Sequence, residues 1–505
     1  MMSRILVLLL VAQSAALAQT ATQPSKPMTQ ASSQPSAPAP RQLRAGPISL
    51  KLADGELRYI YVGEKEIVRR IYFAVRDGSW NTAMPRFSRC EVEDGGDHFT
   101  IHLSAACKLD KVDYAWEATV TGTADGKITF AATGVTNADF ASNRIGLCVL
   151  YGAPSLKGQS FEAFEQSGPA TKGDFPLLVG PPSKLVAQRY QSLRYTTADG
   201  RQVSCTVSGA TFDMEDQRNW GDSSYKAYAP LRYQYPNLKK GQKQQQTVTL
   251  AVTNAPPSAS PEPLHLKITS TPLGKLPTFA PSTQFRNAVA FQDISTGRDR
   301  FNGAKVVIWL YTPTVHLPDN DTIMENIPTV CDQAKSAKAF APEASLHVGA
   351  ALRVPKPNEG RDSRAATPFA ASWTLGMLKY LACGNVEETA FDLGPGYSTQ
   401  VIEAIRPLAG REIVDVETSP HVPLSPSAFA ISDEMGVTVW IANRRDEAMK
   451  IEVEGLGTAA AAKVLQIDSR AKADAAPAER TERAEDGSLK IHLEPYGVCR
   501  IMMAK

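Results

Sequence analysis

Hydrophobic residues change their spacing twice along this 505-residue chain. Between residues 48 and 252 they recur mostly at every second position in short runs, which is typical of β-strands. Between residues 305 and 408 apolar strand-like runs alternate with stretches of helical period, and beyond Pro423 the two-residue alternation returns. This order predicts a multidomain α+β protein in which two β-domains flank a strand–helix domain.

The first β region predicts a large antiparallel sandwich. Asp-Gly dipeptides such as Asp54-Gly55 and Asp125-Gly126 mark tight turns, because glycine accepts positive φ angles without steric cost. The nine predicted strands are Ile48–Leu52, Leu57–Val62, Ile67–Val75, Phe99–Leu103, Tyr114–Val120, Ile128–Thr133, Ile145–Tyr151, Val203–Ser208 and Thr247–Val252.

The middle region predicts right-handed strand–helix–strand units and a parallel sheet or barrel. Its helical stretches are Met324–Phe340, Phe369–Cys383 and Thr399–Leu408, and its strands are Lys305–Tyr311, Leu346–Leu352, Val386–Phe391 and Glu412–Glu417. The region has about 150 residues, whereas a closed eight-stranded barrel usually needs about 250. We therefore expect a truncated TIM-like (β/α) barrel, followed by a small C-terminal β-sandwich.

The N-terminus has the pattern of an exported protein. Arg4 precedes the apolar run Ile5–Val11, and Ala16-Leu17-Ala18 is a small-residue cleavage pattern. We expect periplasmic or extracellular localisation. The predicted divisions are a signal peptide at 1–18, a disordered Pro/Ser/Gln-rich spacer at 19–45, the N-terminal β-sandwich at 46–254, a linker at 255–263, the truncated barrel at 264–420 and the C-terminal β-domain at 421–505.

Composition excludes several classes of partner. The 54 Lys and Arg residues balance 52 Asp and Glu residues, which disfavours a dedicated nucleic-acid binder. No segment after the signal peptide is apolar enough to predict stable insertion in a membrane. Seven cysteines occur without a Cys-x-x-Cys pair, so we expect no metal site and no cofactor. Cys90 and Cys107 are the most plausible disulfide pair if their strands are adjacent.

The densest cluster of polar residues lies between residues 212 and 228. Carboxylates and amides beside aromatic rings are the groups that sugar-like ligands require. A long loop whose charges neutralise one another at a domain junction is the alternative interpretation. The candidate substrate-binding residues are Glu215, Asp216, Arg218, Asn219, Trp220, Asp222 and Lys226.

Several motifs resemble the D-apionate lactonase family. They are Gly63-x-x-Glu66-Ile67-Val68-Arg69, Val75-Arg76-Asp77-x-x-Trp80-x-Thr82, Asn143-Arg144-Ile145-Gly146, the hexapeptide from Glu215 to Trp220, and the segment Ala371–Leu381. The resemblance covers most of residues 46–450. It implies a β-domain, a glycosidase-like barrel, a C-terminal β-sandwich and hydrolysis of the lactone of a branched sugar acid.

The middle region departs from the family pattern. Early barrel units are missing, Asp293 stands where the family has Glu, and Phe391-Asp392 stands where it has Tyr-Glu. Thr312-Pro313-Thr314-Val315-His316 is similar to the family's Pro-Gln-Val-His segment. Both barrel carboxylates are therefore one methylene shorter than in the family.

These residues suggest a catalytic set of Asp293, Asp392 and His316. One carboxylate can activate water while the other protonates a leaving oxygen, and His316, Arg218 or Lys226 can stabilise an oxyanion. In the alternative, both carboxylates are surface groups on a degenerate scaffold.

The leading hypothesis is an exported lactonase acting on a small sugar or sugar-acid lactone. The alternatives are a catalytically inactive carbohydrate-binding or scaffold protein and a glycoside hydrolase. The sequence leaves the substrate and the oligomeric state open.

Overall fold

The computed structural model describes residues 40–165, 168–230, 237–253, 264–353, 361–434, 436–456, 461–470 and 477–504. The predicted signal peptide at 1–18, the linker at 255–263 and most of the spacer at 19–45 lie outside these ranges. Within the described ranges, β1 (Arg41–Ala45) pairs with the strand after it, so a strand occupies the last five residues of the range predicted as spacer.

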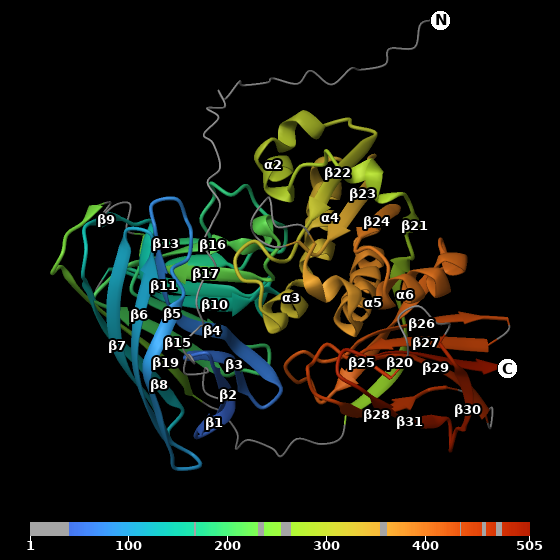
Figure 1. The fold of residues 1–505 in the computed structure, drawn as a ribbon, viewed down its shortest axis with the longest axis horizontal. Helices are drawn as coiled ribbons and strands as arrows, with labels where there is room; N and C mark the ends of the chain where they lie inside the picture. Colours follow the sequence, from blue (N-terminus) through green and yellow to red (C-terminus); the bar gives the residue numbers. More distant parts are fainter. Residues whose placement is uncertain are drawn as a thin grey trace, which may run out of the picture. The chain divides into compact units, whose positions relative to one another are not determined.

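The N-terminal region forms two large sheets (Figure 1). In spatial order, the first contains β1 (Arg41–Ala45), β2 (Ile48–Ala53), β3 (Glu56–Val62), β4 (Lys65–Arg76), β10 (Arg144–Gly152), β17 (Ser224–Tyr228), β16 (Phe212–Asp216) and β13 (Ala187–Tyr190). The second contains β12 (Thr171–Asp174), β11 (Ser160–Phe164), β14 (Ser192–Thr196), β15 (Gln202–Ser208), β19 (Lys243–Thr253), β8 (Lys127–Thr136), β7 (Val112–Thr123), β6 (Phe99–Leu109) and β5 (Pro85–Asp94). All nine predicted strands fall within these observed strands.

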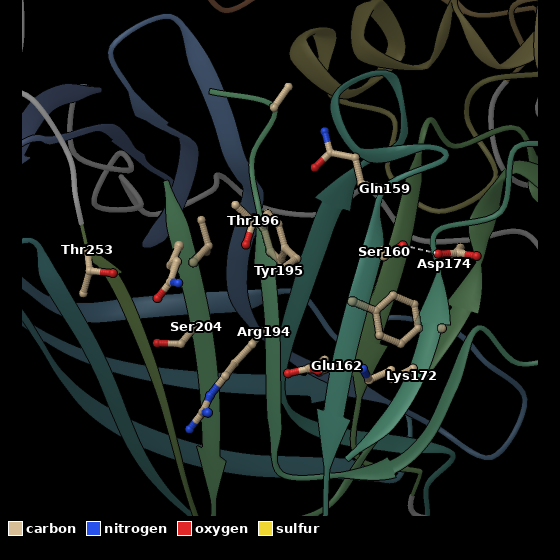
Figure 2. A pocket seen from close by; sticks show the side chains of 15 residues that line it. Gln159, Ser160, Glu162, Lys172, Asp174, Arg194, Tyr195, Thr196, Ser204 and Thr253 are labelled. Carbon is tan, nitrogen blue, oxygen red and sulfur yellow. Dashed lines mark hydrogen bonds and ion pairs between the residues drawn. The ribbon is translucent and has the colours of Figure 1, made fainter. Parts of the chain in front are cut away.

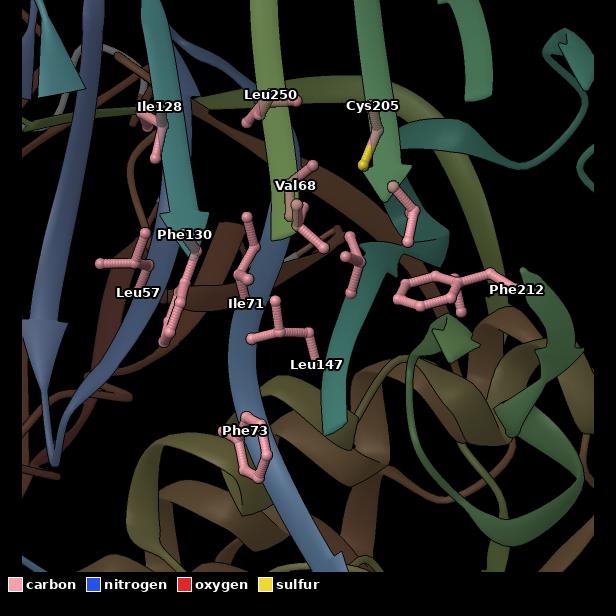
Figure 3. Packing of buried hydrophobic residues seen from close by; sticks show 14 of the residues in the cluster. Leu57, Val68, Ile71, Phe73, Ile128, Phe130, Leu147, Cys205, Phe212 and Leu250 are labelled. Carbon is pink, nitrogen blue, oxygen red and sulfur yellow. The ribbon is translucent and has the colours of Figure 1, made fainter. Parts of the chain in front are cut away.

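Apolar side chains from both sheets form one core (Figure 3). Ile71 and Leu147 from the first sheet are buried with Phe130 and Leu250 from the second. The alternation of apolar and polar residues places every second side chain on this inner face. At the β2–β3 hairpin, Asp54 and Gly55 have φ angles of 51° and 72°, the left-handed pair that a two-residue turn of type I′ requires.

Cys90 and Cys107 lie on adjacent strands but do not pair. In the β5–β6 register Cys90 is opposite Leu103 and Cys107 is opposite Pro85. All seven cysteines are free thiols in the structure. The sequence could indicate adjacent strands but not the register between them, which decides whether two sulfur atoms meet.

The middle region is a truncated barrel. Its parallel sheet has the order β21 (Thr278–Phe279), β24 (Glu388–Asp392), β23 (Ser345–Ala351) and β22 (Val306–Tyr311). The first strand pairs with the last, as in a closed barrel. Between β21 and β22 the chain adds one bridge to this sheet, from Ala290 to Leu310, which agrees with the predicted loss of early barrel units.

Nine helical segments accompany these strands among the described residues. They are η3 (Ser282–Phe285), α2 (Phe291–Thr296), η4 (Arg298–Phe301), α3 (Asn320–Asn326), α4 (Thr329–Phe340), η5 (Ser363–Ala366), α5 (Pro368–Cys383), α6 (Tyr397–Ile405) and η6 (Arg406–Leu408). The helix predicted at 324–340 is two helices, α3 and α4. Asp319 caps the first by accepting a hydrogen bond from the Thr322 amide, and Pro328, which has no amide proton, precedes the second.

The face of the parallel sheet that would line a closed barrel is covered by the chain itself. Leu310, Gly349 and Ala390 are neighbours in the strand register, and Phe285 of η3 packs on Gly349. A Cβ atom at residue 349 would lie 2.7 Å from the Phe285 Cβ, so only glycine fits there. Phe285, which is 3% exposed, therefore covers part of this face, and a cavity of about 170 Å³ remains beside it.

The C-terminal region is a nine-stranded sheet. Its order is β30 (Glu479–Arg483), β29 (Ala461–Ile467), β32 (Val498–Ala504), β27 (Gly436–Ala442), β26 (Ser427–Asp433), β25 (Glu412–Ser419), β20 (Leu264–Lys275), β28 (Met449–Glu454) and β31 (Ser488–Leu493). Strands β20 and β25 come from the range 264–420 that was predicted as barrel, but they pair antiparallel with each other in this sheet. Hydrophobic period identifies a strand without indicating which sheet it joins.

The packing of Phe285 gives a prediction about stability. The substitution Phe285→Ala would leave a cavity against Gly349, and we expect it to lower the free energy of unfolding by about 3 kcal/mol. Denaturant-induced unfolding measures this change. Val289→Ala, at a residue that is 48% exposed, is the control and would change stability by less than about 0.5 kcal/mol. Equal effects of the two substitutions would contradict a packed barrel interior.

Candidate functional site

Charged side chains are buried on the outer face of the first N-terminal sheet. In the register of β4, β10, β17 and β16, Arg76 is opposite Arg144, and Lys226 lies between Leu150 and Glu215. Side chains two residues apart share a face, so this polar row lies on the side of the sheet away from the sandwich core. Its members are Arg70, Tyr72, Arg76, Arg144, Glu215, Lys226 and Tyr228.

His316 approaches this face and pairs with Asp222. The Nδ1 atom of His316 lies 2.7 Å from an Asp222 carboxylate oxygen. Asn326 of α3 donates from Nδ2 to the other oxygen of Asp222 at 3.2 Å, and the Ser223 amide donates to Asn326 Oδ1 at 3.0 Å. The carboxylate therefore holds the imidazole in one orientation. With the proton on Nδ1, Nε2 is the basic atom.

Burial lowers the pKa of His316 below its ordinary value. The Asp222 carboxylate opposes this shift, whereas Lys226 and Arg76 add to it because their positive charges disfavour the imidazolium. The imidazole is therefore held in its neutral, basic form at neutral pH. The Trp220 ring lies edge-on to it, with 6.2 Å between the ring centroids.

Lys226 is a buried amine without a salt bridge. It is 2% exposed, and within the described ranges its ammonium makes no hydrogen bond or ion pair. Its nearest aromatic contact is the Tyr72 ring, whose centroid lies 5.5 Å from Nζ. Burial, together with the charges of Arg144 and Arg76, lowers the pKa of Lys226 well below its ordinary value.

A small cavity joins these groups. Asp222, Lys226 and His316 line it, together with Arg69, Arg70, Tyr72, Leu150, Ser224, Leu317, Thr322, Glu325 and Asn326. Its volume is about 10 Å³, which is room for roughly one water molecule. A water held there would touch the imidazole, the amine or both. A larger ligand would have to bind at the rim, where the His316 side chain is 16% exposed.

Ion pairs connect the middle domain to this sheet. Arg69 pairs with Glu66 and, at 3.7 Å, with Glu325 of α3. Arg58 donates to Asp319 at 2.8 Å, and this arginine lowers the pKa of the Asp319 carboxyl well below its ordinary value despite burial. These pairs fix the segment that presents His316 and Asn326 to the sheet.

Arg218 joins the two domains at a second point. It donates to both oxygens of Asp216, at 2.9 and 2.7 Å, and to Asp332 of α4 at 3.1 Å. Its remaining donors reach the carbonyls of Pro176 and Leu177. Arg218 is 0% exposed, so every polar contact it makes is within the protein.

The other predicted binding residues divide by location. Asn219 donates to the Gly180 carbonyl at 2.9 Å and is buried with Asp216 and Arg218. Glu215 accepts hydrogen bonds from Tyr228 and Gln217 and lies 3.9 Å from Arg144. The structure thus brings Asp222, Lys226, His316 and Trp220 together, and it places Asp216, Arg218 and Asn219 in the domain junction.

Asp293 and Asp392 lie apart from the Asp222–His316 pair. Asp392 ends β24 and pairs with Arg361 at 2.9 Å and with Arg353 at 3.4 Å. It lines a separate cavity of about 170 Å³ with Phe285 and Gly349. Asp293 is exposed on α2, and among the described residues its side chain has no hydrogen bond or ion pair. Their predicted role in proton transfer stays a prediction.

A large, open hollow lies on the second N-terminal sheet (Figure 2). Its volume is about 970 Å³, and Glu162, Lys172, Arg194 and Ser204 line it along strands β11, β12, β14 and β15. Ser160 donates to Asp174 at 2.5 Å across one side. This open surface holds none of the predicted site residues, so we place the candidate site at the Asp222–His316 pair instead.

Three family models match the chain in order. The D-apionate lactonase N-terminal domain matches residues 28–255, its TIM barrel domain matches 291–401, and its C-terminal immunoglobulin-like domain matches 423–501. The chain belongs to the D-apionate lactonase family. A curated D-apionate lactonase from Brucella anthropi is 30% identical over 246 residues, which are 47% of this chain and 40% of that protein. The chain therefore spans less than half the length of the family member it matches.

Solved structures resemble the chain only weakly. A GH30 endoxylanase from Clostridium papyrosolvens is 12% identical with a TM-score of 0.32, over 45% of this chain and 56% of the enzyme. Slr1438 from Synechocystis is 10% identical with a TM-score of 0.30, over 45% of this chain and 99% of that protein. No functional argument rests on these similarities.

The described residues contain neither a helix suited to a bilayer nor a cluster of metal-binding side chains. None of their helices has both the length and the apolarity needed to cross a bilayer. No group of three or more His, Cys, Asp or Glu side chains in the described ranges could hold a metal ion.

The sequence did not indicate Asn326, Glu325 or Arg76 as parts of the candidate site. Asn326 and Glu325 are on α3, about a hundred residues from Asp222, and only the folded chain brings them together. The signal for Arg76 and Arg144 was their presence in motifs shared with the D-apionate lactonase family.

The Arg218 contacts predict a large loss of stability on substitution. Arg218→Ala would leave the buried Asp216 and Asp332 carboxylates without their counter-charge, which we expect to cost about 3–5 kcal/mol of unfolding free energy. Chemical denaturation measures the change. Arg194→Ala removes an exposed arginine from the second sheet and would cost less than about 0.5 kcal/mol. Wild-type stability in the Arg218 variant would show that the junction does not depend on this residue.

Proposed function

We propose that this protein hydrolyses the lactone of a sugar acid, with His316 as general base. The observation that supports this proposal most strongly is the buried Asp222–His316 hydrogen bond beside the buried amine of Lys226, at a cavity large enough for one water. A base, a site for the attacking water and a hydrogen-bond donor for the oxyanion are what lactone opening requires. Membership of the D-apionate lactonase family supports the same reaction class.

The reaction follows from the positions of the groups. His316 Nε2 accepts a proton from the bound water as its oxygen attacks the lactone carbonyl carbon. The carbonyl oxygen becomes the oxyanion of a tetrahedral intermediate. When the ring C–O bond breaks, the imidazolium returns the proton to the departing alkoxide. The product is an open-chain hydroxy acid, and Asp222 stabilises the imidazolium throughout.

Lys226 is suited to the oxyanion. Burial lowers the pKa of Lys226, but a negative charge that develops close by favours its ammonium form. The amine can donate an N–H hydrogen bond to the oxyanion as the intermediate forms, and it needs no further proton to do so. The interaction is weak in the ground state and strong in the transition state, which is the difference that accelerates a reaction.

A second candidate function is sugar binding without catalysis. It is favoured by the packing of Phe285 on Gly349, because this contact covers part of the sheet face on which a barrel enzyme would bind its substrate. In that case the N-terminal sheet would still bind a sugar ligand, but the protein would not hydrolyse lactones to hydroxy acids. Glycoside hydrolysis has less support, because Asp392 is neutralised by two arginines and Asp293 stands apart from it.

The lactonase proposal predicts that His316 is essential. In a pH-stat assay on a panel of sugar-acid lactones, the wild-type protein would release acid, and His316→Gln would reduce kcat by roughly 100-fold or more. His98 offers a matched control, since it also pairs with an aspartate, Asp97, at 2.8 Å but is exposed on the second sheet. His98→Gln would leave kcat unchanged. Wild-type rates equal to the uncatalysed rate would support the binding function instead.

The pH profile tests the role of Asp222. Because burial lowers the pKa of His316, kcat/KM would fall only as the pH decreases below about 6.5, where the imidazole becomes protonated. Asp222→Asn removes the charge that favours the imidazolium, so the acid limb would move to lower pH while kcat drops by roughly 100-fold or more. A lower kcat with an unmoved acid limb would contradict direct coupling between the two residues.

A further inference from the structure

An exposed tryptophan stands at the end of β4 in a fixed turn. Trp80 is 45% exposed, and its φ angle of 69° is in the left-handed region that bulky residues rarely adopt. Asp77 holds the turn: one carboxylate oxygen accepts the amides of Ser79 and Asn81, and the other accepts the Asn81 side chain, all at 2.8 Å. An exposed indole held in a strained backbone conformation is a feature that folding alone does not require.

A stack of side chains supports the indole from the sheet. The Arg144 guanidinium lies 5.4 Å from the centroid of the Trp80 ring and 3.5 Å from that of Tyr228. Glu215 completes the stack, because it accepts the Tyr228 hydroxyl and lies 3.9 Å from Arg144. Arg144 and Tyr228 are 3% and 2% exposed and Glu215 is partly buried, so the side chains that support the indole are held in place.

Arg76 connects this turn with the candidate site. Its guanidinium donates to the Trp80 carbonyl at 3.3 Å. The same guanidinium is near enough to His316 and Lys226 to disfavour a second positive charge on either of them. The Trp80 turn therefore lies along the edge of the polar row that contains Lys226, on the same side of the sheet.

We propose that Trp80 is a stacking platform for the ring of a sugar ligand at the rim of the candidate site. The C–H groups on one face of a sugar ring pack against an indole, while its hydroxyls and ring oxygen need polar partners at the edge. The Trp80 turn offers both, because Arg76 and Arg144 lie beside the indole. The cavity at His316 is too small for a sugar ring, so a platform outside it supplies the surface that the cavity lacks. This inference rests on the proposed function for its substrate and names the part of the substrate that Trp80 contacts.

Steady-state kinetics on the best lactone of the panel test the platform. We expect Trp80→Ala to raise KM by roughly 10-fold while kcat stays within about threefold, because stacking contributes equally to ground-state and transition-state binding. Trp80→Phe would recover most of the affinity, since it keeps an aromatic face. Leu178→Ala, at an exposed apolar residue of similar exposure (46%), would leave KM unchanged. Unfolding curves of each variant confirm that the fold is intact.

Direct binding separates this proposal from the proposed function. Isothermal titration calorimetry measures the binding of methyl pyranosides and furanosides and of open-chain sugar acids to the wild-type protein, and the titration is repeated with Trp80→Ala. Binding of ring sugars that is lost in the variant, without any hydrolysis by the wild type, would retain the platform and overturn the lactonase. An unchanged KM in Trp80→Ala, or no ring sugar bound by the wild type, would overturn the platform. If Trp80→Ala changed the oligomeric state and left KM unchanged, the indole would contact another copy of the chain and not a sugar, which would also overturn the platform.

Discussion

The fully buried guanidinium of Arg218 is the interaction on which the arrangement of the site depends. It neutralises Asp216 of the N-terminal sheet and Asp332 of α4 together, and without the N-terminal domain the buried Asp332 would lose this guanidinium as a partner. Such a pair contributes little net stability compared with apolar packing, but breaking it is costly, so it selects one arrangement of the two domains. Asp222 and His316 come from opposite sides of this junction. Their 2.7 Å contact exists only while the junction holds.

The family's glycosidase-like barrel is reduced here, and the catalytic machinery we propose lies outside it. Four parallel strands remain, and Phe285 packs on the face that a closed barrel would enclose. The groups suited to hydrolysis are on the outer face of the N-terminal sheet and on the segment that follows β22. The loss of barrel units therefore removes one possible site but leaves the Asp222–His316 pair and its water-sized cavity in place.

Local patterns in the sequence predicted most of the elements, because hydrophobic period reports what a strand or helix buries. The nine N-terminal strands and the truncated barrel follow from it. Sheet membership of β20 and β25, the register that separates Cys90 from Cys107 and the packing of Phe285 depend on distant pairings that no local pattern encodes. The same limit applies to the site. The cluster after residue 212 pointed to Asp222 and Lys226, but the sequence could not distinguish these from Asp216 and Arg218, whose charges are satisfied within the protein.

The pairing of β21 with β24 has a consequence for the evolution of this fold. The first and last strands in chain order, β21 and β24, are paired with each other. In the described sheet, the gap that a closed barrel would fill therefore lies between β21 and β22. Strand–helix units could be inserted there, or removed, without breaking any of the three pairings that remain. The segment from η3 to α2 can therefore accept the insertion or loss of strand–helix units. Such changes would leave the Asp222–His316 pair in place, because neither residue belongs to that segment.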